Sequence, residues 1–132
     1  MKKFGLLIML AFFLAACTSG KTEFFPSRGY SADAAQVTVI REERIFGFGF
    51  SMKVLFDGKV IARLKAGQYV SFYAASGVRT IAIPDSSVRA VLEAGGKFYF
   101  LIKTESSQFG FEIERISEKK AKQVMAQSHS IN

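Results

Sequence analysis

The stretch from Met52 to Leu64, MKVLFDGKVIARL, decides the fold class. Apolar side chains recur at every second position on both sides of Asp57-Gly58, which is the period of a strand with one buried face. Both central residues of a type I′ turn need positive φ, and an Asp-Gly pair tolerates that conformation. The stretch therefore predicts a β-hairpin whose two strands turn these side chains toward the core: Met52, Val54 and Phe56, then Val60, Ala62 and Leu64.

Short apolar runs broken by turn residues continue on both sides of this hairpin. Upstream, Gln36 to Arg41 predicts one strand. Downstream, turn signals such as Ser76-Gly77 and Gly95-Gly96 separate further runs, predicting strands at 68–74, 78–83, 88–93, 97–104 and 109–114. The run at 97–104 is apolar on both faces, so we expect it in the centre of a sheet.

This spacing of strands and turns predicts a mainly β fold. Seven or eight short strands are typical of an antiparallel β-sandwich, and a small barrel is the alternative. After the last strand, Ser117 has the character of a helix N-cap, and Ala121, Val124 and Met125 form a short apolar stripe. We therefore expect a short C-terminal helix, followed by a flexible tail at 127–132.

The N-terminal residues have the pattern of an export signal. Lys2 and Lys3 precede an apolar run from Phe4 to Ala16. A membrane-spanning helix needs about 20 apolar residues, so this run is too short to span and has the length of a signal-peptide core. Its end, LAAC at 14–17, resembles the bacterial lipobox, which predicts cleavage between Ala16 and Cys17 and attachment of diacylglycerol and further acyl chains such as palmitate to the cysteine.

Two alternatives for Cys17 are a buried structural cysteine and an ordinary secretory cut. It is the only cysteine, and polar residues 18–21 follow it with nothing to bury it. Lipidation is therefore favoured, and an internal disulfide is excluded. The chain is predicted to divide into a signal peptide at 1–16, lipidated Cys17 with a tether at 17–34, the sandwich at 35–126 and the tail. Thr18 rather than Asp after the cysteine resembles the sorting signal for the outer membrane, facing the periplasm.

The charge of the chain does not indicate a nucleic-acid partner. Its formal net charge is +7, but the basic residues are scattered among acidic ones. Nucleic-acid binding requires a coherent basic stripe, so none is predicted. A weak attraction to anionic lipid or acidic glycan remains compatible with this composition.

Residues with catalytic or metal-binding chemistry are few, so we predict no enzyme, no metal and no cofactor. The only histidine, His129, lies in the predicted tail, where it is poorly placed for a Ser-His-acid set. One histidine and one cysteine cannot form a Cys/His metal site. Glu112 and Glu114 share a strand face that we expect to be solvent-exposed. The glycines at 47–49 lack the spacing that binds phosphate.

The segment Ile45-Phe-Gly-Phe-Gly-Phe50 carries three aromatic residues that would point one way in a strand. Burial in the core is the favoured interpretation. The other is an exposed aromatic ridge that grips a partner or stacks on sugar rings, and a second same-face pair of tyrosines has the same ambiguity. The candidate binding surface comprises Arg41, Arg44, Phe46, Phe48, Phe50, Tyr69 and Tyr73.

The order of motifs resembles a family of small bacterial envelope lipoproteins, the domain-of-unknown-function 2846 type. The resemblance rests on the lipobox, the hairpin, KAGQYV at 65–70, SGVR at 76–79 and AGGKFYF at 94–100. Ser76-Gly77 stands where that family usually has Pro-Gly, which alters the stiffness of that turn. The resemblance implies a β-sandwich and no catalytic residues.

Together these features predict a lipid-anchored, non-enzymatic binding or structural accessory of the envelope. Its partners would be the bilayer, through Cys17, and an envelope protein or glycan. The alternative is a glycan-binding or hydrolase-inhibitor domain in the periplasm. Solvent exposure of the aromatic candidates discriminates the two, because a side chain in a dry core cannot touch a sugar.

Overall fold

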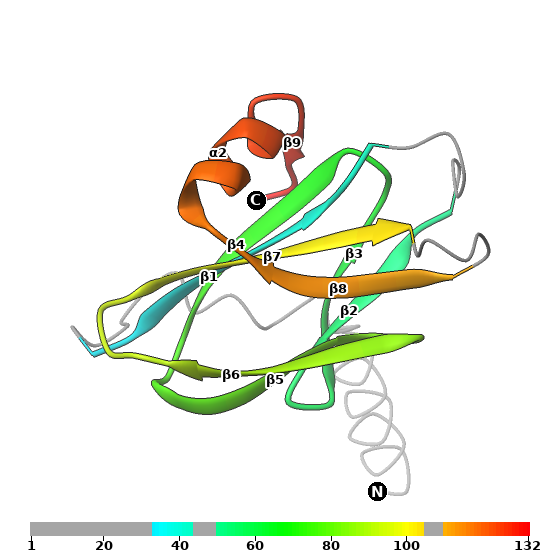
Figure 1. Cartoon of the computed structure of the whole chain (residues 1–132). Helices are drawn as coiled ribbons and strands as arrows, with labels where there is room; N and C mark the ends of the chain where they lie inside the picture. Colours follow the sequence, from blue (N-terminus) through cyan, green and yellow to red (C-terminus); the bar gives the residue numbers. More distant parts are fainter. Residues whose placement is uncertain (1–32, 44–49, 105–109) are drawn as a thin grey trace, which may run out of the picture.

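Two β-sheets pack face to face in the computed structural model, which describes residues 33–43, 50–104 and 110–132 (Figure 1). One sheet has five strands and the other has four. A short helix lies over the outer face of the five-stranded sheet, and the C-terminal residues extend the edge of that sheet (Figure 1). The predicted β-sandwich with a C-terminal helix is confirmed, and the sheets do not close into a barrel.

The five-stranded sheet has the order β8-β7-β1-β4-β9. Its strand β1 pairs antiparallel with β4 but parallel with β7, and β9 pairs parallel with β4. A purely antiparallel sandwich is therefore wrong for this sheet. Between β4 and β7 the chain crosses to the other sheet, and β7 then runs in the same direction as β1. The bounds are β1 Ala35–Arg41, β4 Gln68–Ala74, β7 Lys97–Thr104, β8 Phe111–Ile116 and β9 His129–Ser130.

The four-stranded sheet is antiparallel throughout, in the order β3-β2-β5-β6. Its hairpin turns at the predicted residues, where Asp57 has φ 48° and Gly58 has φ 83°. Positive φ at both positions is what a type I′ turn requires. The bounds are β2 Met52–Phe56, β3 Lys59–Leu64, β5 Gly77–Ile83 and β6 Ser86–Leu92.

A β-bulge in this hairpin corrects one predicted core position. Val54 pairs with Ala62, whereas Leu55 pairs with Val60, so Ile61 is an extra residue in β3. A bulge of this kind changes the alternation of side chains along its strand. As a result Ile61 is fully buried and Val60 is 46% exposed, which is opposite to the simple alternation expected from the sequence.

The core lies between the sheets and consists of the inward side chains of both. Phe56 of β2 and Phe72 of β4 meet edge to face across it, with ring centroids 5.3 Å apart. Strand β7 is buried on both faces, as predicted, because Phe100 points into this core while Leu101 points out under the helix. The strand at the centre of the sheet is nevertheless β1, and the largest fully buried apolar side chains are Phe100, Ile40, Ile61, Leu64, Ile81, Leu92 and Ile102.

Helix α2 (Glu118–Met125) begins at the predicted cap, where the backbone N–H of Lys120 donates to Ser117 Oγ at 3.2 Å. Its residue Ala121 is fully buried, and it packs in one cluster with Ile40 and Leu101 on the outer face of the five-stranded sheet. A second, smaller apolar core is thereby formed. The sheet is covered on both faces around this cluster.

The C-terminal residues, which the sequence predicts as a flexible tail, are hydrogen bonded to β4 in the structure. The backbone N–H of His129 donates to the Gly67 carbonyl at 2.8 Å, and that of Ile131 donates to the Tyr69 carbonyl at 3.0 Å. The Asn132 side-chain amide donates to a further carbonyl of β4. These bonds satisfy the free edge of β4, a pairing that apolar periodicity does not encode.

Candidate functional site

Arg41, the last residue of β1, is buried at one end of the sandwich, with 1% of its surface exposed. Its Nη1 donates to the Leu64 carbonyl at 2.7 Å and to the Phe50 carbonyl at 2.8 Å. Burial lowers the pKa of the Arg41 guanidinium from its usual value, yet a guanidinium stays protonated in a protein. The cation therefore ties β1 of one sheet to β3 of the other.

Two aromatic rings enclose this cation. The guanidinium carbon of Arg41 lies 4.6 Å from the centroid of Phe50 and 5.4 Å from that of Phe111. The two rings themselves meet edge to face at 5.7 Å. Cation–π and edge contacts of this kind fix the orientation of a ring. Phe50 is therefore held in place although 44% of its surface faces solvent.

A hollow of about 410 Å³ opens beside these rings. Apolar side chains form most of its wall, while Lys53 and Asp85 place one positive and one negative group at its surface. A concave, mainly apolar site with few polar groups is the usual form of a small-ligand pocket. We name it the Phe50 hollow; its lining residues are Phe50, Ser51, Met52, Lys53, Pro84, Asp85 and Phe111.

The structure does not bring the four described binding candidates, Arg41, Phe50, Tyr69 and Tyr73, onto one surface. Arg41 is a buried anchor and not an exposed basic residue, which corrects its predicted role. Tyr69 packs with the cluster under α2, and Tyr73 lies on the same outer face of β4. Phe50 alone of the described candidates combines a fixed ring with large exposure, and Ala16, Cys17, Arg44, Phe46 and Phe48 lie outside the described residues.

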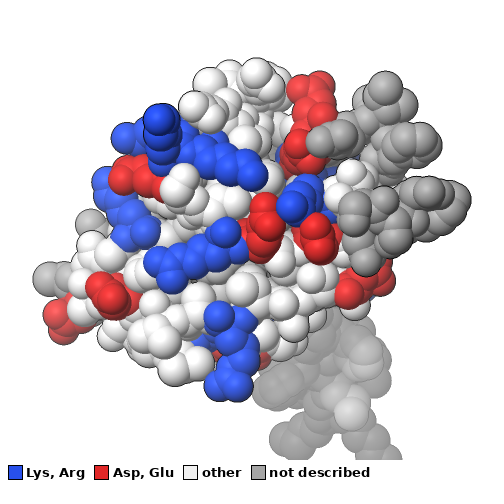
Figure 2. Space-filling model, viewed as in Figure 1, with Lys and Arg blue, Asp and Glu red and all other residues white. Residues whose placement is uncertain are grey.

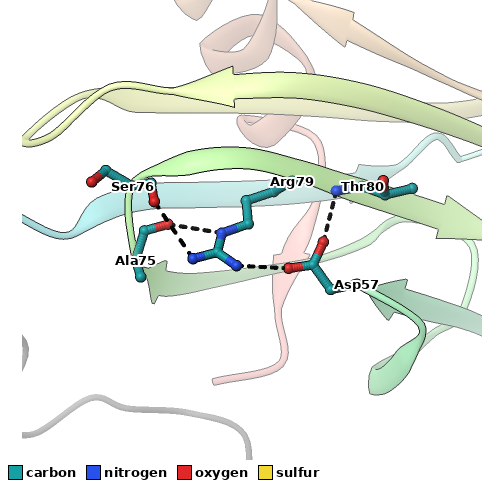
Figure 3. Close-up of polar contacts among 5 residues, drawn as sticks. All are labelled: Asp57, Ala75, Ser76, Arg79 and Thr80. Atoms are coloured by element: carbon teal, nitrogen blue, oxygen red, sulfur yellow. Dashed lines mark hydrogen bonds and ion pairs between the residues drawn. The ribbon is translucent and has the colours of Figure 1, made fainter.

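A polar network at the opposite end of the hairpin was not found from the sequence. Arg79 lies between the Asp57 carboxylate on one side and the carbonyls of Ala75 and Ser76 on the other (Figure 3). Its Nη1 is 3.0 Å from Asp57 Oδ2, and the backbone N–H of Thr80 donates to Asp57 Oδ1 at 2.9 Å. Each carboxylate oxygen of Asp57 accepts a hydrogen bond in this network, which fixes two turns of the four-stranded sheet. The Asp-Gly turn and the SGVR motif were the only signals in the sequence.

The paired acids of β8 have a structural explanation as well. Lys103 Nζ lies 3.4 Å from Glu112 Oε1 and 3.1 Å from Glu114 Oε2. The hydrogen bond to Glu114 is the main cause that raises the pKa of Lys103. Figure 2 shows basic and acidic side chains next to one another over β7, β8 and α2. A shared lysine on an exposed face is a surface ion pair, as expected, and does not form a pair of carboxylates facing across a cleft.

Within residues 33–43, 50–104 and 110–132, no group of three or more His, Cys, Asp or Glu side chains could hold a metal ion. No helix in this part of the chain is long and apolar enough to cross a membrane.

No known family model matches the sequence, and no curated protein matches it. Among solved structures, the fold is similar to the N-terminal domain of AlgF from P. aeruginosa. The match covers 67% of this chain and 100% of that domain, with 10% identity and a TM-score of 0.46. A likeness this distant does not transfer a function.

Proposed function

We propose that this chain is a non-enzymatic lipoprotein of the bacterial envelope, held by acyl chains on Cys17 at the outer membrane and facing the periplasm. The observation that carries the proposal is LAAC at 14–17, placed at the end of a basic and then apolar start. One acyl chain binds a membrane only marginally, and additional chains make the anchor stable. The sandwich is then the binding domain, and the tether connects it to the anchor.

We infer that this domain binds another envelope component through the Phe50 hollow. Its exposed ring is already fixed by Arg41 and Phe111, so binding would not cost the ordering of a mobile side chain. Aromatic anchors at the centre of an interface often carry most of its binding energy. The geometry thus supports a contact surface whose central residue is Phe50.

A second candidate, recognition of a glycan in the periplasm, is favoured by the same hollow. A sugar ring offers an apolar face to an aromatic ring and hydroxyl groups to charged side chains. Lys53 and Asp85 supply both a donor and an acceptor in the lining of the hollow. The two candidates differ in the size and chemistry of the partner.

The anchor is tested by Cys17→Ser in the full chain. We expect the variant to lose acylation and either to leave the membrane fraction or to stay unprocessed, with the sandwich still folded by circular dichroism. Mass spectrometry of the wild-type mature N-terminus should find acylated Cys17. A mature protein that begins elsewhere and is freely soluble would contradict the proposal.

The hollow is tested by Phe50→Ala in pull-downs from solubilised envelopes. This change keeps the backbone carbonyl that accepts from Arg41, so the fold should persist. We expect at least a tenfold loss of partner recovery, equivalent to about 1.4 kcal/mol. Ile131→Ala is the matched control, because Ile131 is similarly exposed at 39% and lies outside the hollow. Wild-type recovery of no partner above background would count against the binding role.

Phe50→Leu separates the two candidates. Leucine keeps an apolar contact but has no ring face for a sugar. Binding to oligosaccharide, followed by titration calorimetry, should be lost in this variant if the partner is a glycan. A protein partner should retain most of its affinity.

A further inference from the structure

We propose that the outer face of the four-stranded sheet lies on an anionic lipid bilayer, so that the anchored domain rests on the membrane by this side. The inference rests on the proposed function, because the acyl anchor keeps the domain beside a bilayer. We call this surface the bare face. It is formed by the outward side chains of β2, β3, β5 and β6.

Charge is distributed unevenly on this sheet. Its four strands contain no Asp or Glu, whereas they contain five basic residues. One of the five, Arg79, is engaged with Asp57. Three of the others, Lys53, Arg63 and Arg89, are exposed and point outward from the bare face. Lys53 is paired with Arg63 and Arg89 with Thr80, and these pairs alternate along the strands with the buried ones.

Exposed valines lie among these basic residues. Val60, Val78 and Val91 are 46%, 56% and 61% exposed. Val78 and Val91 are direct partners on β5 and β6, so their side chains lie together on the bare face. No helix or strand among the described residues covers them, in contrast to the outer face of the other sheet.

An anionic bilayer is the partner that fits this combination. Each Lys or Arg near a negatively charged membrane surface contributes attraction, and small apolar side chains lie among the headgroups without a pocket to receive them. A second copy of this face would bring like charges together, which opposes self-association. The nearest acids lie in turns or beyond strand ends, at Asp57, Asp85 and Glu93.

The entry point of the tether agrees with this orientation. The Gly95 N–H donates to the Ala34 carbonyl at 3.3 Å, so the chain enters the domain beside the turn that follows β6. Val91 lies at that end of β6. The tether between Cys17 and this point reaches roughly 55–60 Å when extended, at about 3.3–3.6 Å per residue. It is long enough for the bare face to settle on the bilayer and short enough to keep the local concentration of lipid high.

The experiment uses the acylated full chain carrying Val91→Cys. The thiol of Cys17 is blocked by acylation, so the new cysteine takes an environment-sensitive fluorophore alone. The protein is reconstituted on vesicles of phosphatidylcholine, with or without phosphatidylglycerol. We expect the emission to shift to the blue and rise about twofold or more on the anionic vesicles only, and to revert in 1 M salt, where the Debye length is about 3 Å. Lys119→Cys, on the exposed side of α2, is the matched control and should not respond.

A charge variant sharpens the test. Arg63→Gln with Arg89→Gln should weaken docking on anionic vesicles about fivefold for each residue neutralised. Lys119→Gln with Lys122→Gln removes the same charge from α2, which lies on the other sheet, and should leave docking unchanged.

The remaining outcomes overturn the inference and separate it from the anchor. Protein that sediments with the vesicles while the Val91 label stays unchanged retains the anchor and has no docked face. Protein that does not sediment with any vesicle overturns both proposals. A label response that follows protein concentration and not phosphatidylglycerol would mean that a second copy covers the face.

Discussion

The outer faces of the two sheets differ in whether another element covers them. On the five-stranded sheet, Ile40 and Leu101 are at most 2% exposed because α2 packs on them. On the four-stranded sheet, Val78 and Val91 remain more than half exposed. Acids and bases pair on the first, as at Lys103, and the strands of the second contain no acid. The difference shows that a β-rich pattern places apolar residues on sheet faces without telling which face will be covered.

The largest expected loss of stability comes from a substitution on the face that α2 covers. Leu101→Ala should lower the free energy of unfolding by about 3 kcal/mol, because the removed atoms leave a cavity between the sheet and α2. Urea denaturation measures this loss. A loss below about 1 kcal/mol would mean that α2 is loosely docked and that the two faces are energetically alike.

Substitution of Arg41, which links the two sheets, should give the next largest loss of stability. Arg41→Ala leaves the carbonyls of Phe50 and Leu64 without their donor, and we expect a loss of about 2 kcal/mol in the free energy of unfolding. Arg41→Lys keeps one charge but cannot reproduce the planar guanidinium, so it should recover only part of the loss. Full recovery by lysine in the same denaturation experiment would contradict the geometry described for this cation.

The stability of α2, which covers the five-stranded sheet, is tested at the N-cap of the helix. Ser117→Ala removes the acceptor of the Lys120 N–H and should cost about 1 kcal/mol. Ser117→Asp keeps an acceptor at the positive end of the helix dipole and should restore stability. Hydrogen exchange of α2 amides should increase in the alanine variant, while amides of β5 and β6 stay protected.

The smallest effect should be on the bare face. Val91→Thr keeps the β-branched shape and adds a hydroxyl that water can reach, so the free energy of unfolding should change by less than about 0.5 kcal/mol. A thermal melt compares it with Leu101→Ala. A large loss at Val91 would show that this side chain is covered in the folded protein, and the contrast between the faces would disappear.

Much of the fold could be predicted because it depends on local signals. Asp57-Gly58 tolerates positive φ, and Ser117 caps a helix, so these two boundaries agree with the structure. The bulge at Ile61 could not be predicted, because one extra residue in a strand leaves no mark in an alternating pattern. Parallel pairing of β1 with β7 joins residues about 60 positions apart, which propensity and turns do not encode.

The candidate site was less predictable for a related reason. Phe50 is one of three aromatic candidates in its segment, and the orientation of its ring depends on Phe111, which comes from another strand. Arg41 ends an apolar strand, where an arginine normally reaches solvent. Its burial requires acceptors from Phe50 and Leu64, which lie 9 and 23 positions further along the chain and outside β1. The charge contrast between the sheets could not be seen until the register assigned each strand to its layer.

The central position of β1 also constrains the order in which the molecule can form. This first strand needs both β4 and β7 as neighbours, and β7 ends only at Thr104. During synthesis, β1 therefore lacks one of its two neighbours until about four fifths of the chain has emerged. On the export proposed above, this delay would keep the polypeptide extended until it has crossed the membrane.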